Sequence, residues 1–221
     1  MNNKSKTSYV VGGVILISVF VTHQIFLHEQ LNRYASRLEN RVNHLRSYVK
    51  IDNMRNDNIN RVLSVLNNFN DSLSAETKYA IASEISEASM KYENLDVNLI
   101  CATITHESAL TWHPRVVSPA GALGLMQVMP ETGRFLAKIE GLEWNSPEEV
   151  LFDPVLNIRL GSRYLSSLIE LYDVDGGLAA YNGGGKRAEL WIARNRADGI
   201  LYYETQNYVP AVLSLYKQFQ N

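Results

Sequence analysis

The order of apolar and polar positions divides the chain into parts of different character. Residues 9–27 form an apolar run that is nearly pure aliphatic over residues 10–21 and is then interrupted by Thr22, His23 and Gln24. Residues 28–71 space their apolar positions regularly, and residues 72–221 carry helical patterns interrupted by glycine and proline. We therefore predict a short basic N-terminus over residues 1–8 and a transmembrane anchor over residues 9–27. A helical stalk with an Asn-rich linker is expected over residues 28–71, followed by a folded domain over residues 72–221.

The apolar run has the length of a membrane span. Nineteen helical residues extend about 28 Å, which is roughly one hydrocarbon thickness. The run is either a membrane helix or a signal peptide, and the absence of a small-residue cleavage site after it favours an uncleaved anchor. Four arginines between Arg33 and Arg46 outnumber Lys4 and Lys6 before the run. This charge bias taken alone would put the C-terminal part in the cytoplasm, whereas the function inferred below requires the opposite side.

The stalk contains an apolar seam whose spacing alternates between four and three residues. This spacing is typical of the a and d positions of about three heptads. The seam consists of Leu31, Ala35, Leu38, Val42, Leu45 and Val49. Self-association, a partner helix through residues 31–49, and packing onto the folded domain all remain open. The following stretch is rich in asparagine, which has poor helix propensity, and it predicts a hinge near residues 52–58 and a boundary near residue 71.

Helix signals dominate the region from residue 72 onward, and no alternating strand of convincing length appears, so we expect an all-α domain. Asp96 is placed to cap a helix that runs through Glu107, Ser146 and Glu149 form a capping box, and Asp153 opens a further helix. Glycines are expected in the loops. They are Gly121, Gly124, Gly176, Gly177 and Gly183 to Gly185.

Composition and charge exclude some classes of protein. The chain is 46% hydrophobic and 20% charged, as is normal for a folded protein. Residues 72–221 hold twelve Lys and Arg against eighteen Asp and Glu, so the basic face that nucleic-acid binding requires is missing. Cys101 is the only cysteine and cannot form an intrachain disulfide.

Glu107 is the first candidate for chemistry. Ile100 and Ile104 share one helix face, and Glu107 ends that apolar stripe. Desolvation there would raise the pKa of the carboxyl group and keep it protonated, as a general acid requires. The alternative from position alone is a surface glutamate at a helix end. His106 and Glu107 could also begin a zinc-protease motif, but position 110 is leucine and the pattern fails, so we expect no metal.

Three further blocks follow Glu107-Ser108 in the chain. They are Ser118 to Pro130 (SPAGALGLMQVMP), Ala180 to Gly183 (AYNG) and Glu204 to Val209 (ETQNYV). Their content and order resemble the lytic transglycosylases with the soluble-lytic-transglycosylase (SLT) domain, glycoside hydrolase family 23. The resemblance covers about residues 75–219, and four blocks in register are far more specific than any one of them.

The resemblance implies a lysozyme-like all-α domain with a cleft for a glycan strand and with Glu107 as the catalytic residue. It also assigns positions that contact the substrate: Ser118, Met126, Gln127, Tyr181, Asn182 and Tyr208. For Ser108, Glu204 and Met126 a structural reading stays open, namely capping, hydrogen bonding between helices, or core packing.

The implied mechanism uses one carboxylate. Ordinary glycosidases use two, but no Asp or Glu lies between Glu107 and Glu131. The resemblance implies instead that the acetamido group of N-acetylmuramic acid assists and that a 1,6-anhydro end forms without water, metal or cofactor. The expected protein is a membrane-anchored peptidoglycan lyase for wall remodelling or for local wall opening by a secretion apparatus or a phage. Its catalytic domain would face the cell wall from the bacterial inner membrane or a virion membrane. A goose-type lysozyme hydrolase and a non-catalytic glycan-binding scaffold are the alternatives.

Two segments depart from the family pattern. Residues 109–117 are about two residues longer than the usual loop and contain Trp112, which predicts a reshaped cleft wall. Pro210 follows Tyr208 where a helix should run, and it is expected to bend or delay that helix because proline lacks a backbone donor.

Overall fold

A computed structural model describes the backbone of residues 3–221 and the side chains of residue 13 and residues 16–221. The chain forms two compact units, residues 1–53 and residues 54–221. Within the described residues the regular structure is helical, and the extended pairing consists of two isolated bridges, Val117 with Leu123 and Leu123 with Val128. The predicted all-α class is confirmed.

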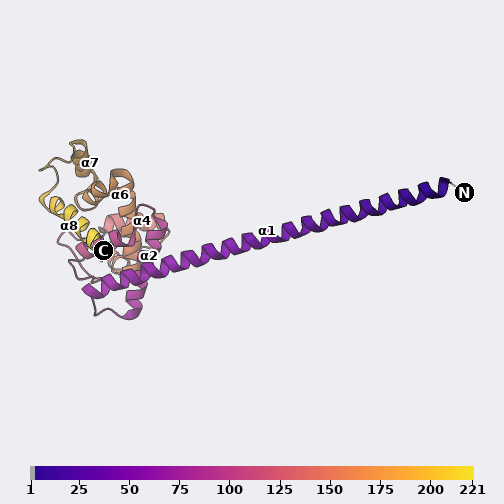
Figure 1. The fold of residues 1–221 in the computed structure, drawn as a ribbon. Coiled ribbons are helices and arrows are strands. Elements are labelled where there is room, and N and C mark those ends of the chain that lie inside the picture. The colour runs from indigo at the N-terminus through magenta and orange to yellow at the C-terminus, as the bar shows by residue number, and fades with distance from the viewer. Residues whose placement is uncertain (1–2) are drawn as a thin grey trace. The chain divides into compact units, whose positions relative to one another are not determined.

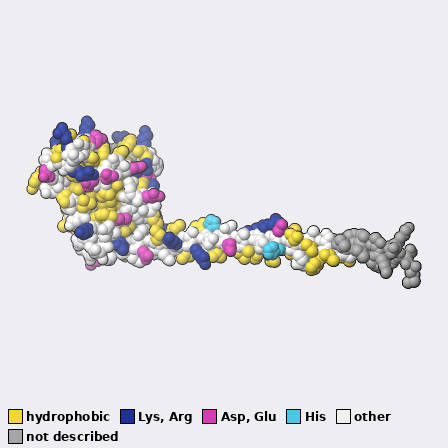
Figure 2. Space-filling model, turned by 45° about the horizontal axis from the view of Figure 1, so that its top comes forward, with side chains coloured by type: hydrophobic (Ala, Val, Ile, Leu, Met, Phe, Trp, Pro, Cys, Tyr) yellow, Lys and Arg dark blue, Asp and Glu magenta, His cyan; other side chains and the backbone are white. Residues whose placement is uncertain are grey.

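The first unit consists of the greater part of helix α1 (Asn3–Phe69). The helix continues through residues 52–58, where a hinge was predicted. The seam side chains from Leu31 to Val49 are exposed, and Figure 2 shows hydrophobic side chains at intervals along this helix. Among the described residues no helix combines the length and hydropathy that a membrane span needs. In the predicted anchor, the side chains of residues 9–12, 14 and 15 lie outside the described residues.

The last turns of α1 belong to the second unit and to its core. Ile59 is 4% exposed, and Val62 and Leu66 are fully buried. This unit starts at Met54, well before the boundary predicted near residue 71. Burial of these aliphatic side chains, each of which stabilises the fold by roughly 1.5–3 kcal/mol, outweighs the poor helix propensity of the neighbouring asparagines.

Helix α6 is the centre of the second unit, since α2, α4, α5, α7 and α8 all pack against it (Figure 1). Helix α3 packs against α2 and α8. The helices that follow α1 are α2 (Ala75–Lys91), α3 (Val97–Glu107), α4 (Pro130–Glu140), α5 (Pro147–Leu151), α6 (Pro154–Gly183), α7 (Gly185–Ala193) and α8 (Tyr203–Phe219).

The predicted N-caps are present. The carboxylate of Asp96 accepts hydrogen bonds from the backbone N–H groups of residues 98 and 99 at 2.8 and 3.0 Å. The hydroxyl of Ser146 accepts one from residue 149 at 3.1 Å, and Asp153 accepts one from residue 156 at 2.9 Å. Each cap pairs backbone donors that a helix leaves without an internal partner, which fixes where α3, α5 and α6 begin.

Helix α6 changes direction at Asp173, whose backbone angles (φ 61°, ψ −178°) are not helical. The loop expected at Gly176 and Gly177 is wrong, because both residues lie inside the helix beyond this kink. A Cβ atom on Gly177 would lie 2.6 Å from Cγ1 of Ile169, and one on Gly176 would lie 2.8 Å from Cδ1 of Ile192. These glycines therefore permit close packing rather than a turn.

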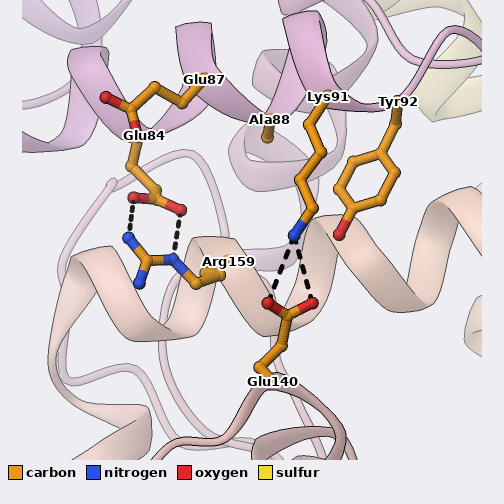
Figure 3. Close-up of a pocket in the computed structure, with 7 residues that line it drawn as sticks. All are labelled: Glu84, Glu87, Ala88, Lys91, Tyr92, Glu140 and Arg159. Carbon is orange, nitrogen blue, oxygen red and sulfur yellow. Dashed lines mark hydrogen bonds and ion pairs between the residues drawn. The ribbon is translucent and has the colours of Figure 1, made fainter.

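Ion pairs join α2 to α6 and to the end of α4 around a pocket of about 240 Å³ (Figure 3). Nε and Nη2 of Arg159 donate hydrogen bonds to the carboxylate of Glu84 at 2.8 and 2.6 Å. Glu140 pairs with Lys91 at 3.2 Å and with Arg163. Cations of the chain itself pair with both carboxylates. These ion pairs hold α2, α4 and α6 together around the pocket.

Candidate active site

Glu107 is the last residue of α3 and faces α8. The three turns before it are almost wholly buried, which holds the helix end in place. The hydroxyl of Tyr208 on α8 donates a hydrogen bond to Oε1 of Glu107 at 2.7 Å. Tyr208 is 2% exposed, and the ring of His106 packs edge-on against it with centroids 4.8 Å apart. The carboxyl group is therefore positioned by a buried donor from another helix.

The electrostatics of Glu107 suit a group that must carry a proton at neutral pH. Burial of the carboxyl group raises the pKa of Glu107 to about 7. The hydrogen bond from Tyr208 opposes this rise, and the nearby negative charge of Glu204 adds to it. Glu107 can thus exist in both protonation states near pH 7, which is the requirement for a residue that acts as acid and then as base.

Tyr181 reaches the same region from the end of α6. Its hydroxyl donates to the carbonyl oxygen of Met126 at 2.7 Å, and its ring lies 5.4 Å from that of Tyr164. Burial raises the pKa of Tyr181 well above its usual value, and the charge of Glu107 raises it further. Tyr181 is therefore a permanent hydrogen-bond donor within electrostatic reach of Glu107.

Asn182 connects α6 to α8. Its side-chain amide donates a long hydrogen bond of 3.5 Å to Oε1 of Glu204, one turn before Tyr208 on α8. The approach of the two helices is close, since a Cβ atom on Gly183 would lie 2.6 Å from the hydroxyl of Thr205. The structure thus brings Tyr181, Asn182 and Tyr208 to the region around Glu107.

The loop before α4 is held by Asn157, a fully buried residue of α6 that the sequence analysis missed. Its Oδ1 accepts from the backbone N–H of Met126 at 2.8 Å, and its Nδ2 donates to the carbonyls of Leu123 and Leu151 at 2.9 and 2.8 Å. Gly124 has a φ of 80°, and a Cβ there would lie 2.2 Å from Nδ2 of Asn157. The available signal was an asparagine between apolar neighbours in the stripe of α6.

The predicted contact residues of this loop differ in position. The side chain of Met126 is fully buried beneath Gly161, so it belongs to the core. Gln127 is partly exposed with a φ of 46°, and its Nε2 donates to the carbonyls of Val116 and Gly124 at 3.1 and 2.8 Å. Ser118 is partly exposed, and its hydroxyl accepts from the N–H of residue 122 at 3.0 Å. Both side chains brace the loop and present their remaining surface to solvent.

In the long loop after α3, the side chain of Trp112 lies in the core rather than in a cleft wall, and the predicted reshaping of the wall stays a prediction. Trp112 is fully buried, and its Nε1 donates to the hydroxyl of Thr105 at 2.9 Å. The hydroxyl of Ser108 accepts from the backbone N–H of Trp112 at 3.0 Å, which favours the structural reading of Ser108. The extra residues turn the chain inward through positive φ values at Ala109, Leu110 and Trp112.

Pro210 does not delay α8, which begins at Tyr203 and continues to Phe219. Thr205, Tyr208, Val209 and Val212 are buried along it. This packing maintains the helix although Pro210 cannot donate to the carbonyl of Gln206.

A family model described as "Transglycosylase SLT domain" matches residues 84–203. A putative soluble lytic murein transglycosylase of Haemophilus influenzae is 34% identical over 142 residues, covering 60% of this chain and 23% of the relative. The soluble lytic murein transglycosylase of Escherichia coli K12 is 35% identical over 123 residues, covering 51% and 19%. The transglycosylase of Enterobacteria phage PRD1 is 35% identical over 114 residues, covering 51% and 38%.

Solved structures show the same likeness. The crystal structure of the 70 kDa soluble lytic transglycosylase of Escherichia coli aligns with a TM-score of 0.55 and 28% identity over 65% of this chain and 25% of that chain. A lytic transglycosylase of Pseudomonas aeruginosa, solved as an inactive glutamate-to-glutamine mutant, aligns with a TM-score of 0.55 and 29% identity over 62% and 23%. This chain spans about a quarter or less of the length of these two proteins.

Proposed function

The chain belongs to the family of transglycosylases with an SLT domain, and on that premise we propose that it is a membrane-anchored lytic transglycosylase of peptidoglycan. It cleaves the β-1,4 bond between N-acetylmuramic acid and N-acetylglucosamine and leaves 1,6-anhydro ends. The observation that carries the proposal is Glu107, whose pKa of about 7 and hydrogen bond from Tyr208 fit one residue that both gives and takes a proton.

The first step is general acid catalysis. Protonated Glu107 gives its proton to the glycosidic oxygen, and the bond from that oxygen to the anomeric carbon of N-acetylmuramic acid breaks. The acetamido oxygen of the same sugar stabilises the positive anomeric carbon. Tyr208 stabilises the carboxylate that remains. Burial and the charge of Glu107 raise the pKa of Tyr208, so the Tyr208 hydroxyl stays protonated and stays a hydrogen-bond donor.

The second step closes the product ring. The Glu107 carboxylate takes the proton of the C6 hydroxyl of N-acetylmuramic acid, and the resulting oxygen attacks the anomeric carbon and displaces the acetamido oxygen. Glu107 ends protonated, as it began, so the cycle needs neither water nor a second carboxylate. Ser118, Gln127, Tyr181 and Asn182 are proposed to bind the glycan around this bond, while Met126 acts through its backbone carbonyl, which receives the hydroxyl of Tyr181.

A goose-type hydrolase is the second candidate, and one observation favours it. Glu204 contributes a second carboxylate whose charge reaches Glu107, and hydrolytic glycosidases use a carboxylate pair. Digesting purified peptidoglycan in heavy-oxygen water separates the two reactions by mass spectrometry. The transglycosylase releases unlabelled fragments that are one water lighter than hydrolysis products. Labelled reducing ends without anhydro species would refute the proposal in favour of the hydrolase.

The role of Glu107 is tested by Glu107→Gln, which keeps the shape of the side chain and removes its proton transfer. We expect lysis to fall by about a thousand-fold, while binding to insoluble peptidoglycan is retained. A glycan-binding scaffold predicts a different result: the unaltered chain would bind peptidoglycan and fail to lyse it, just as the Glu107→Gln variant does. Glu131→Gln, at an exposed position in the first turn of α4, is the matched control and should leave lysis unchanged.

The proposed anchor is the apolar run of residues 9–27, and the catalytic domain is placed on the cell-wall side because its substrate lies there. We expect the full chain expressed in a bacterium to stay with membranes after washing with high salt and alkaline carbonate, and the double variant Ile17→Lys, Val19→Lys to be released. Protease added to spheroplasts should degrade the domain. Release of the unaltered chain, or protection of its domain, would overturn this part of the proposal.

The exposed seam of α1 is proposed to pair with a second copy of the chain. Leucines occupy the d positions 31, 38 and 45, and β-branched valines occupy the a positions 42 and 49, which favours parallel two-stranded coiled coils. Sedimentation of the detergent-solubilised chain should give a dimer, and Leu38→Lys should give a monomer. Asn40→Lys, two positions along the same exposed helix, should remain dimeric. A monomeric unaltered chain would rule out self-association.

A further inference from the structure

A second pocket lies on the side of α8 that faces away from Glu107. At 3.6 residues per turn, Gln206 points roughly opposite to Glu204 and Tyr208, which are four residues apart on the catalytic face. The pocket has a volume of about 260 Å³ and lies between the end of α7, the loop that follows and α8. Its wall includes Trp191, Arg196, Asp198, Leu201, Gln206 and Pro210.

The loop that forms this pocket is held in a strained conformation. Asn195 and Arg196 both have positive φ values, 52° and 57°. Nε and Nη2 of Arg196 donate to the carboxylate of Asp175 at 2.5 and 2.9 Å, and its backbone N–H donates to the carbonyl of Trp191 at 2.8 Å. Two consecutive residues in the left-handed region persist only where surrounding structure maintains them. The ion pair ties the loop to α6, and the backbone bond ties it to α7.

The groups in the pocket combine an apolar wall with hydrogen-bond acceptors. Trp191 provides an aromatic side chain, and Leu201 and Val209 continue the apolar surface. Pro210 has no N–H to give to the carbonyl of Gln206, so a helical acceptor is left for another donor. The side chains of Asp198 and Gln206 are exposed and add further acceptors.

The charge balance of the pocket disfavours an anionic ligand. The guanidinium of Arg196 is already paired with Asp175, while Asp198 forms no ion pair within the described residues and would repel an anion. The volume is just below the ~300–1,000 Å³ typical of ligand pockets, which suits one sugar ring rather than a chain. The guanidinium of Arg196 lies over the Trp191 ring, 5.6 Å from its centroid, so a pyranose packs its apolar C–H face against the part of the ring that stays exposed. Its hydroxyl and amide groups donate to the acceptors.

We propose that this pocket binds one uncharged N-acetylhexosamine unit of a glycan. It would hold the polymer at a second point, distant from the site at Glu107. The inference rests on the proposed function, because that function makes an N-acetylhexosamine polymer the substrate. Pro210 inside α8 then has a role, since it leaves the carbonyl of Gln206 without its helical donor.

The test observes the three tryptophans of the full chain separately by ¹⁹F NMR after incorporation of fluorotryptophan, in the Glu107→Gln background. Titration with N-acetylglucosamine should shift the Trp191 resonance saturably and leave that of Trp112, which is fully buried, unchanged. Trp191→Phe assigns the signal. Pro210→Ala restores the helical N–H and should weaken binding about five-fold. A silent Trp191 resonance, or equal affinity in Pro210→Ala, would overturn the proposal.

Activity gives an independent measurement in the chain with Glu107 intact. Trp191→Ala should lower the ratio of turnover on insoluble peptidoglycan to turnover on short soluble fragments several-fold. Phe135→Ala, which removes an exposed aromatic on α4, should leave that ratio unchanged. If the unaltered chain releases anhydro fragments but Trp191 stays silent, the pocket assignment fails and the proposed function stands. If Trp191 responds but nothing is lysed, the proposed function fails and the pocket stands.

Discussion

At the scale of single residues, the central feature is a carboxyl group under opposing influences. Burial raises the pKa of Glu107 to about 7, Tyr208 stabilises its ionised form, and Glu204 destabilises that form. Neither neighbour is close to Glu107 in sequence, since both come from α8. The protonation state of the candidate catalyst is therefore set by how α3 and α8 pack.

The pH dependence of turnover should report this balance. A general acid is active only while protonated, so turnover should fall as the pH rises through about 7. Glu204→Gln removes a negative charge that raises the pKa of Glu107, and the falling limb should move to lower pH. Initial rates on peptidoglycan from pH 4 to 9 measure both curves. A limb that stays in place would show that Glu204 does not act on Glu107.

The same raised pKa has a cost in stability that depends on pH. Below the ordinary glutamate value of 4.5 the group is neutral in the folded and the unfolded chain, whereas above about 7 the folded chain must hold it ionised. Glu107→Gln should therefore raise the melting temperature at pH 8 by roughly 7–14 °C and leave it nearly unchanged at pH 4. Thermal unfolding followed by circular dichroism checks this. An equal increase at both pH values would trace the effect to packing rather than ionisation.

At the scale of elements, the loop before α4 depends on a residue of another helix. Asn157 is fully buried, accepts one hydrogen bond from a backbone N–H and donates two to backbone carbonyls of two segments. Gly124 is required beside it, because any side chain would collide with the Asn157 amide. The conformation of the loop that carries Gln127 therefore depends on the side chain of Asn157.

Removing the Asn157 side chain should destabilise the fold. Asn157→Ala leaves the N–H of Met126 and the carbonyl of Leu151 without partners, while the carbonyl of Leu123 keeps the N–H of Val128. We expect the free energy of unfolding to fall by about 3 kcal/mol. That corresponds to a melting temperature lower by roughly 6–12 °C, and peptidoglycan lysis should fall with it. Asn145→Ala, at an exposed position, is the control and should change neither. Unchanged stability of Asn157→Ala would mean that water replaces the lost bonds.

Local signals predicted the elements better than their packing. The caps at Asp96, Ser146 and Asp153 follow from a few adjacent residues, and the structure confirms them. The role of Asn157 depends on Leu123 and Met126, which are more than 30 residues away, so its apolar neighbours could indicate burial but not its partners. Among the candidate site residues, the motif blocks located Glu107 and Tyr208, but only the fold shows that they touch.

At the scale of the whole molecule, the end of α1 belongs to the core of the second unit. A chain that begins at residue 72 loses Ile59, Val62 and Leu66, whose burial stabilises the fold by about 5 kcal/mol or more. Since domains are stable by only about 5–15 kcal/mol, residues 72–221 should melt far below residues 54–221, or lack a cooperative transition. Calorimetry of the two chains compares them, and equal melting temperatures would contradict the role of α1 in the core.

Because α1 continues into the second unit, the position of a proteolytic cut decides whether that unit is released with its core complete. A protease that cuts before Met54 releases a unit with its core complete. A cut in the exposed turn at Asp71 and Ser72 instead leaves the last turns of α1 attached to the released part by packing alone. We therefore expect cleavage upstream of residue 54 to release a stable domain, and cleavage at the turn to destabilise it.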